Sequence, residues 1–221
     1  RVERTQEVYV VLDATRLSQQ ELPDAMKQAD TWPDSIYERY VTAATVLAMA
    51  ANRYGDHIGL ASFSDHLELF IRAKNGSAHL HHCQEALAKQ HPKAVTPDFN
   101  EVLSALRLRL RHRSLVIFLT DLSDPNAAET FTDHISILSR QHHVLVIMIT
   151  PDSLQPVFQG SNISSKQEIY ARLSGHLQWQ ALRKTQLTLK RHGVSLATAT
   201  EENLAVTVVN RYIQAKQRQL V

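Results

Sequence analysis

The feature that most constrains the fold is a series of short apolar runs separated by segments long enough for helices. Consecutive apolar residues of this kind are typical of parallel strands that helices cover on both faces. The runs lie at 8–12, 58–63, 115–119 and 144–149, with a weaker one at 194–198. A further run at 67–71 alternates instead, with Glu68 on one face, and it follows 58–63 closely. It therefore predicts an antiparallel edge strand joined to 58–63 by a hairpin.

Helical spacing fills the intervals between these runs. Between 36 and 51, apolar residues recur at steps of three and four, and Gly55 follows where a C-cap is expected. Asp124 predicts an N-cap, with Pro125 in the first turn of its helix. Five further helices are predicted at 78–89, 99–111, 126–140, 165–191 and 201–219.

The alternation of strands and helices predicts an α/β fold. We expect a doubly wound, mostly parallel sheet with one antiparallel edge strand and helices on both faces. We expect one domain over 1–221, with a core over 1–150. The remainder, 151–221, would add a loop, a long helix, the last strand and a closing helix. Two polar segments, 15–33 and 151–164, interrupt the pattern as long loops, which are often functional.

Composition excludes several classes of protein. Lys and Arg number 24 against 22 Asp and Glu, and this small excess gives little reason to expect a nucleic acid partner. A single cysteine, Cys83, excludes an internal disulfide and suits a reducing compartment. No apolar run approaches the ~20 residues of a membrane span. The chain begins at Arg1 rather than Met, which is consistent with a fragment whose membrane segment lies upstream.

Polar side chains gather where the predicted strands end. Asp13 follows the first strand and Asp121 follows the strand at 115–119, while the segment before residue 99 opens a helix. In an open parallel sheet, ligands bind outside the carboxyl ends of the strands, where the strand order reverses. Three loops would bring these oxygen-bearing residues to one strand-end rim: Asp13, Thr15, Thr96, Asp98, Thr120, Asp121 and Ser123. Magnesium prefers such ligands, usually one or two carboxylates with waters.

Simpler explanations exist for the same residues. Thr15 and Ser18 are common turn formers, and Asp98 is a suitable helix N-cap. Two carboxylates on one rim repel each other unless a positive charge lies between them. That charge would be a magnesium ion or the guanidinium of Arg16 folded back onto the acids.

The same segments carry a resemblance to a known family. They are "ERTQEVYVVLDATRLS", "YGDHIGLASFSD", "RHRSLVIFLTDLSDP", "SRQHHVLVIMITP" and "LAVTVVNRYIQAKQRQLV", and they extend from residue 3 to the last residue. Together with the order of elements, they resemble a von Willebrand factor A domain. The specific resemblance is to the bacterial family called domain of unknown function fifty-eight.

The resemblance implies a metal-ion-dependent adhesion site in degenerate form. In such a site an Asp-x-Ser-x-Ser loop, a Thr and a further Asp hold the ion, and the matching residues here are Asp13, Thr15, Thr96 and Asp121. Leu17 stands where the second hydroxyl belongs, and Ser18 comes one residue late. The first loop is closer to a subgroup whose sequence is Asp-Thr-Gly-Arg. We therefore expect Mg²⁺ to bind weakly or not at all.

The resemblance also implies a function. Such proteins are interaction modules that work with a MoxR-type AAA+ ATPase and a client protein, in the assembly or maturation of protein complexes. That role would place the chain at the cytoplasmic face of the bacterial inner membrane, with the membrane reached only through a segment outside it. The residues expected to contact a partner on the rim are Asp13, Arg16, Ser18, Trp32, Asp98 and Ser123.

Other functions follow less directly from the residues. A metal-dependent phosphoesterase would use Asp13 and Asp121, but it needs a general base that no motif places near them. An inert scaffold is the other alternative. With 6 glycines and no Gly-rich phosphate loop, we expect no nucleotide. The run "LRLRLRHRS" is either a solvated helix end or a basic face that contacts a partner or acidic lipid.

Overall fold

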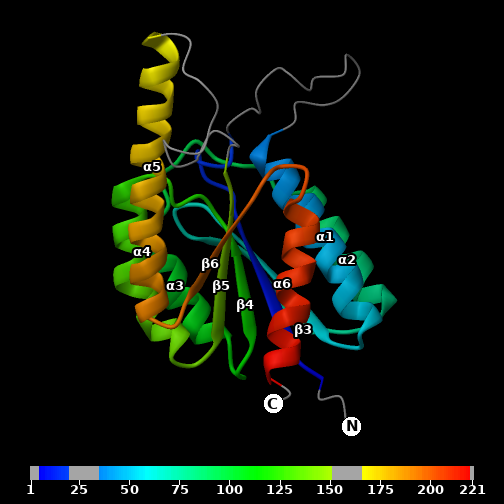
Figure 1. Ribbon diagram of the computed structural model, residues 1–221. Coiled ribbons are helices and arrows are strands. Elements are labelled where there is room, and N and C mark those ends of the chain that lie inside the picture. Colours follow the sequence, from blue (N-terminus) through cyan, green and yellow to red (C-terminus); the bar gives the residue numbers. More distant parts are fainter. Residues whose placement is uncertain (1–4, 20–34, 151–165, 220–221) are drawn as a thin grey trace, which may run out of the picture.

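A six-stranded sheet forms the centre of the molecule (Figure 1). The computed structural model describes residues 5–19, 35–150 and 166–219. The strands lie in the order β3-β2-β1-β4-β5-β6, and all neighbours are parallel except β2 and β3. Their bounds are β1 (Glu7–Asp13), β2 (His57–Phe63), β3 (Leu67–Lys74), β4 (Leu115–Leu119), β5 (His143–Ile149) and β6 (Ser195–Ala199). The predicted mostly parallel sheet with one antiparallel edge strand is confirmed.

Helices cover both faces of this sheet (Figure 1). One layer holds α1 (Ile36–Arg53), α2 (Ser77–Ala88) and α6 (Leu204–Gln219), and the other holds α3 (Phe99–Arg109), α4 (Pro125–Ser139) and α5 (Lys166–Arg191). The pattern of β1 shows why its run is apolar throughout. Val8 and Val10 enter the core under α1 and α6, whereas Tyr9 and Val11 enter the core under α3 and α4. Both faces of the strand are thus buried.

Most helices begin and end close to the residues predicted from the sequence, but two helix ends differ. Asp124 caps α4 as predicted, because its Oδ1 accepts from the Asn126 backbone N–H at 2.9 Å. The third helix ends at Arg109 instead of continuing to 111, so the arginines of "LRLRLRHRS" do not form one helix face. The last helix begins at Leu204 because 201–203 form a turn.

The strand order places the expected site at the centre of the sheet. The chain leaves β1 toward one side and reaches β4 on the other, so the order reverses between these two strands. The carboxyl ends of β1 and β4 therefore meet at the topological switch point, where α/β proteins bind ligands. The last strand, β6, pairs with β5, so residues before and after 150 share one sheet.

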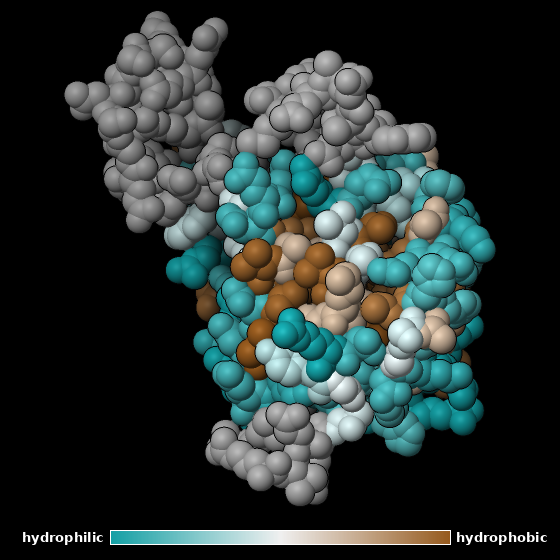
Figure 2. Space-filling model, turned by 90° about the vertical axis from the view of Figure 1, so that its right-hand side faces the viewer, coloured by the Kyte–Doolittle hydropathy of each residue, from teal (hydrophilic) through white to brown (hydrophobic). Residues whose placement is uncertain are grey.

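The helical surface on the α1 and α2 side carries a group of apolar residues (Figure 2). Val46 and Met49 of α1 are its exposed large side chains, at 39% and 54% exposure. Among the helices of residues 5–19, 35–150 and 166–219, none combines the length and apolar character needed to cross a membrane.

Candidate functional site

Asp13 is the buried centre of the strand-end rim. Its Oδ2 accepts a hydrogen bond from the Thr120 hydroxyl at 2.6 Å, and its Oδ1 accepts from the Thr15 backbone N–H at 2.9 Å. All three residues are fully buried. The contact with Thr120 follows from the sheet register, since Leu12 pairs with Leu119 and the next residues of the two strands lie side by side.

The first loop turns back on itself directly after Asp13. Ser18 is buried, and its hydroxyl donates to the Thr15 carbonyl at 2.9 Å. The Thr15 hydroxyl accepts from the Leu17 backbone N–H at 3.3 Å. Ser18 therefore acts as a turn former and directs its oxygen into the loop. Because Leu17 has no side-chain oxygen, this loop supplies one hydroxyl, that of Thr15, beside the Asp13 carboxylate.

Arg16 does not replace a metal ion on the rim. Its side chain is exposed, and within the described ranges it forms no ion pair with Asp13 or Asp121. The Arg16 backbone N–H donates to the Val95 carbonyl at 3.1 Å, which fixes the residue where the loop faces outward. The hypothesis that its guanidinium folds back between the acids is thus wrong. A hydrated position avoids the desolvation of a second charge beside a buried carboxylate.

Backbone hydrogen bonds bring the second loop to the rim. The Lys93 N–H donates to the Ala14 carbonyl at 2.7 Å, and Val95 accepts from Arg16. Thr96 follows Val95 and is exposed. Asp98 caps α3, because its Oδ1 accepts from the Glu101 N–H at 3.1 Å. The loop is therefore near Asp13, but no hydrogen bond joins Thr96 to the Asp13 carboxylate in the part of the chain that the structure describes.

The third loop carries the second acid. Asp121 is partly exposed, and its Oδ1 accepts from the Ser123 backbone N–H at 2.8 Å. Ser123 itself is exposed, so its hydroxyl is accessible to a partner. Trp32, the remaining residue expected on the rim, lies outside the described residues, as does most of the polar segment 15–33.

Two tyrosines of α1 support the rim from below. The Tyr37 backbone N–H donates to the Ser18 carbonyl at 3.0 Å and so ties the first loop to the helix. Burial, together with the nearby charges of Asp121 and Asp13, raises the pKa of Tyr40 well above its ordinary value. Its hydroxyl is fully buried beneath the rim, and among the described residues it meets no partner with hydrogen-bond geometry. The spacing of apolar residues between 36 and 51 includes Tyr40 on the buried face of its helix, but it gives no sign that Tyr40 lies below the two acids.

The residues present fit a tightly held magnesium ion poorly. Asp13, Thr15 and Asp121 offer oxygens, but Leu17 offers none and the Ser18 hydroxyl points back to the Thr15 carbonyl. Magnesium requires near-octahedral coordination by six oxygens. Asp13, Thr15 and Asp121 would supply about half of these oxygens, and Thr96, Ser123 or waters would have to supply the rest.

The burial of Asp13 makes the stability of the protein depend on pH. Burial raises the pKa of Asp13, and the charge of Asp121 raises it further. Hydrogen bonds from Thr120 and Thr15 lower this pKa but only partly oppose the rise. The native state then holds a proton that the unfolded chain releases near pH 4. Stability contributed by Asp13 is therefore greatest at low pH and is lost as pH rises through the folded pKa.

We expect Asp13→Asn to raise the melting temperature by a few degrees at pH 7 in EDTA. Asparagine is neutral, and the Thr120 hydroxyl can rotate to accept from its amide. Thermal denaturation followed by circular dichroism at pH 7 and pH 4.5 measures the effect, and the difference between the two proteins should shrink at the lower pH. A lower melting temperature for the variant at pH 7 would contradict it.

A cluster that sequence reasoning missed lies after β2, at the same end of the sheet. The ligand atoms of Asp65, His66 and Glu68 all lie within 4.8 Å of one another. The Lys93 ammonium and the Ser64 hydroxyl both bind Glu68. Burial opposes ionisation of Glu68, but these hydrogen bonds outweigh it and lower its pKa. The Lys93 ammonium already pairs with Glu68, which makes the cluster part of an ion-pair network. The acid–His spacing in "SDHLE" was its only sequence signal.

A groove adjoins the rim on the Asp121 side. It has a volume of about 790 Å³ and lies between α4, α5 and the end of β5. We call it the rim groove, because it shares three residues with the rim: Asp121, Leu122 and Ser123. Its floor is apolar, with Met148 and Leu182 among the lining residues. A concave surface with an apolar floor and a polar margin is the usual form of a binding site.

Comparison with solved structures shows the same fold in other proteins. The chain is similar to the PilB minor pilin from Streptococcus sanguinis, with a TM-score of 0.61, 12% identity, and coverage of 97% of this chain and 62% of that chain. It is similar to proximal thread matrix protein 1 from the mussel byssus, with a TM-score of 0.51, 14% identity, and coverage of 96% and 46%. It is also similar to the conserved hypothetical protein BatB from Bacteroides thetaiotaomicron, with a TM-score of 0.50, 12% identity, and coverage of 96% and 99%. The chain spans less than two thirds of the first two proteins.

Comparison by sequence identifies the family. A search of curated proteins gives no match. The sequence pattern of the family described as "Protein of unknown function DUF58" matches residues 2–157, which is more than half of the 221 residues. The topology agrees with this match, because β1 and β4 meet at the centre of a doubly wound sheet with an antiparallel edge. The chain is a von Willebrand factor A-like domain and belongs to the DUF58 family.

Proposed function

We propose that this domain is a non-enzymatic protein-interaction module that binds a partner protein through the strand-end rim and the rim groove. The observation that carries the proposal is the continuity of the two surfaces through Asp121, Leu122 and Ser123. The rim holds a buried carboxylate at the switch point of the sheet, where stability alone would favour a neutral side chain. Groups held in an unfavourable state are typical of functional sites.

The lining of the rim groove indicates the chemistry of the partner. Its charged residues are four acids and one base: Asp121, Glu129, Asp133, Glu201 and Lys184. Between them lie apolar side chains such as Met148 and Leu182. A partner segment with basic and apolar side chains would complement both features. The acidic balance also steers association with a basic partner at low salt.

We further propose that the partner contact does not depend on tightly bound metal. Leu17 in place of a hydroxyl ligand and the inward orientation of Ser18 support this view. A weak, water-rich magnesium site at Asp13 and Asp121 remains compatible with the same contact. The residues proposed to meet the partner are Arg16, Trp32, Asp98 and Ser123. Asp13 and Ser18, which were also expected on this surface, are buried and would shape the rim from beneath.

The proposed partners are a MoxR-type AAA+ ATPase and a client protein. The support is the sequence resemblance described above together with the family match over residues 2–157. The ATPase would supply the energy for assembly or maturation of a protein complex, and this domain would engage the partner. We propose that this occurs at the cytoplasmic face of the bacterial inner membrane.

Binding of a MoxR-type ATPase from the same organism tests the proposal. In isothermal titration, Glu129→Lys in the rim groove is expected to weaken binding about tenfold or more, because it reverses a charge facing a basic segment. Glu85→Lys on α2 is the matched control, since Glu85 is exposed outside the groove, and it should leave affinity unchanged. Asp13→Asn removes the buried charge beneath the rim and should also weaken binding. Equal affinity of the wild type, Glu129→Lys and Asp13→Asn would contradict the proposal.

A titration with divalent metal ions and an assay of phosphate ester hydrolysis test whether the protein binds metal and whether it is a phosphoesterase. We expect little heat from Mg²⁺ or Mn²⁺ with the wild-type protein, and partner binding that persists in EDTA. Hydrolysis of a phosphate ester that requires metal and disappears in Asp13→Asn would favour a phosphoesterase and overturn the interaction module.

A further inference from the structure

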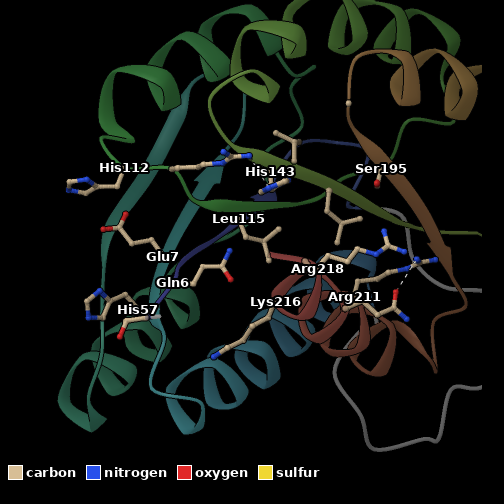
Figure 3. Close-up of a pocket in the computed structure, with 17 residues that line it drawn as sticks. Gln6, Glu7, His57, His112, Leu115, His143, Ser195, Arg211, Lys216 and Arg218 are labelled. Atoms are coloured by element: carbon tan, nitrogen blue, oxygen red, sulfur yellow. Dashed lines mark hydrogen bonds between the residues drawn. The ribbon is translucent and has the colours of Figure 1, made fainter. Parts of the chain in front are cut away.

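A second hollow lies at the end of the sheet opposite the rim. It is a cleft of about 810 Å³ at the amino ends of the parallel strands. Figure 3 shows Glu7 of β1, His57 of β2, His143 of β5 and Ser195 of β6 around it, with α6 on one side. We call it the amino-end cleft. Its position makes it independent of the rim and of the proposed function.

Positive side chains outnumber negative ones in the amino-end cleft. Its described lining has one carboxylate, that of Glu7, and four permanent cations: Arg113, Arg211, Lys216 and Arg218. The Lys216 ammonium is neutralised by Asp56, at 2.9 Å. Within residues 5–19, 35–150 and 166–219, no salt bridge joins the three arginines to a carboxylate. The whole chain has a net charge of only +2, so this concentration of charge is local.

One face of α6 presents two of the guanidinium groups. Arg211, Gln214, Ala215 and Arg218 all line the cleft, and their spacing of three, four and seven residues is that of a single helix face. The Arg211 guanidinium donates to the Gln214 side-chain oxygen at 3.4 Å. Figure 3 shows Arg211 and Arg218 close together on this side of the cleft. The short side chain of Ala215 lies between them in the sequence and also lines the cleft.

Arg113 lines the cleft from another wall, just before β4. Its Nη2 lies 3.2 Å from Nε2 of His143. A guanidinium can only donate, so the His143 nitrogen accepts and the imidazole is neutral. Burial and the charge of Arg113 both lower the pKa of His143, which agrees with this geometry. The positive charge of the cleft therefore rests on three guanidinium groups from two different elements.

We propose that the amino-end cleft binds a phosphate-bearing anion, namely a phosphomonoester or a pyrophosphate group. Guanidinium groups stay charged at every physiological pH and pair with phosphate oxygens through two parallel hydrogen bonds. The volume suits a ligand larger than a single ion. The side chains of Gln6 and Ser195 add neutral hydrogen-bonding groups for the rest of such a ligand. A soluble phosphomonoester and the headgroup of phosphatidic acid share this chemistry.

Isothermal titration with inorganic pyrophosphate in a phosphate-free, low-salt buffer tests the site. We expect saturable binding of one pyrophosphate, weakened about tenfold or more in Arg211→Gln/Arg218→Gln because two charge-assisted pairs are lost. Arg113→Gln should weaken it from the other wall. Lys89→Gln/Arg107→Gln is the matched control, since it removes two exposed cations outside the cleft and should retain wild-type affinity. Thermal denaturation confirms that each variant is folded.

Flotation with phosphatidylcholine vesicles, with and without phosphatidic acid, separates the two sources of ligand. Capture only by the vesicles that contain phosphatidic acid, lost in the Arg211/Arg218 variant, would assign the site to a lipid headgroup. Pyrophosphate binding without vesicle capture would assign it to a soluble ester. Absence of saturable binding in both assays would overturn the proposal, as would equal weakening in the control pair. An oligonucleotide that binds and that pyrophosphate does not displace would also overturn it.

Discussion

Replacing Asp56 with alanine is expected to lower the free energy of unfolding by about 3–5 kcal/mol. The Asp56 carboxylate is buried and joins three parts of the chain. Its Oδ1 accepts from the Gln6 backbone N–H at 3.1 Å, and its Oδ2 accepts from the Tyr212 hydroxyl and, at 2.9 Å, from the Lys216 ammonium. Alanine removes the acceptor from all three donors. It also leaves the charge of Lys216, whose side chain is 12% exposed, without its counter-ion.

Urea denaturation followed by circular dichroism measures this loss. Asp56→Asn is the matched variant, because its amide oxygen still accepts from the Gln6 N–H while its NH2 group can no longer accept from Lys216, so its effect should be smaller. Tyr212→Phe deletes one hydrogen bond and should lower stability by about 1 kcal/mol. A loss below about 1 kcal/mol for Asp56→Ala would show that this network does not hold α6 to the amino end of the sheet.

Gly59→Ala is expected to lower the free energy of unfolding by about 3 kcal/mol, at the upper end of typical overpacking effects. A Cβ at this position would lie 2.3 Å and 2.5 Å from two ring carbons of Tyr9, and 2.8 Å from the Ile71 carbonyl oxygen. The Tyr9 ring stacks on Phe70, and its hydroxyl accepts from the Ala73 N–H at 3.2 Å. Because the ring is held on both sides, β2 and β3 would have to move apart.

Gly193→Ala is the control that distinguishes steric crowding by the added methyl group from the cost of a left-handed backbone conformation. Gly193 has a φ of +75° and no atom within 4 Å of the position that a Cβ would take. Its replacement should lower stability by only about 1 kcal/mol, the usual penalty of a left-handed conformation for alanine. Equal losses for the two glycine variants in thermal denaturation would show that Tyr9 and Ile71 adapt to the added methyl group.

Local patterns were sufficient to predict most of the fold. The strand at 115–119 has the bounds of β4, and Asp124 caps α4 as predicted. These features depend on residues close in sequence, since a strand alternates its faces every two residues and a cap bonds within one turn. The helix predicted to reach residue 111 was less accurate, because its end at Arg109 depends on how Leu110 packs.

The rim was predicted only in outline. Strand-end acids follow from the order of strands, so Asp13 and Asp121 could be assigned to one edge from the sequence. The direction of individual side chains could not be assigned. Ser18 points into its own turn and Arg16 points to solvent, because hydrogen bonds to the Thr15 and Val95 carbonyls orient that loop. Thr120 holds Asp13 through the register between β1 and β4.

The fold class, the family and the edge of the sheet that carries the acids could all be predicted from the amino-acid sequence. All three are encoded in periodicity and in motifs that are contiguous along the chain. Only the tertiary structure revealed the rim groove and the amino-end cleft. Arg113 precedes β4 and Arg211 belongs to α6, and no pattern in the sequence links them. They line one cleft because β4, β5 and β6 lie side by side in the sheet and α6 packs across it, which is a property of long-range packing alone.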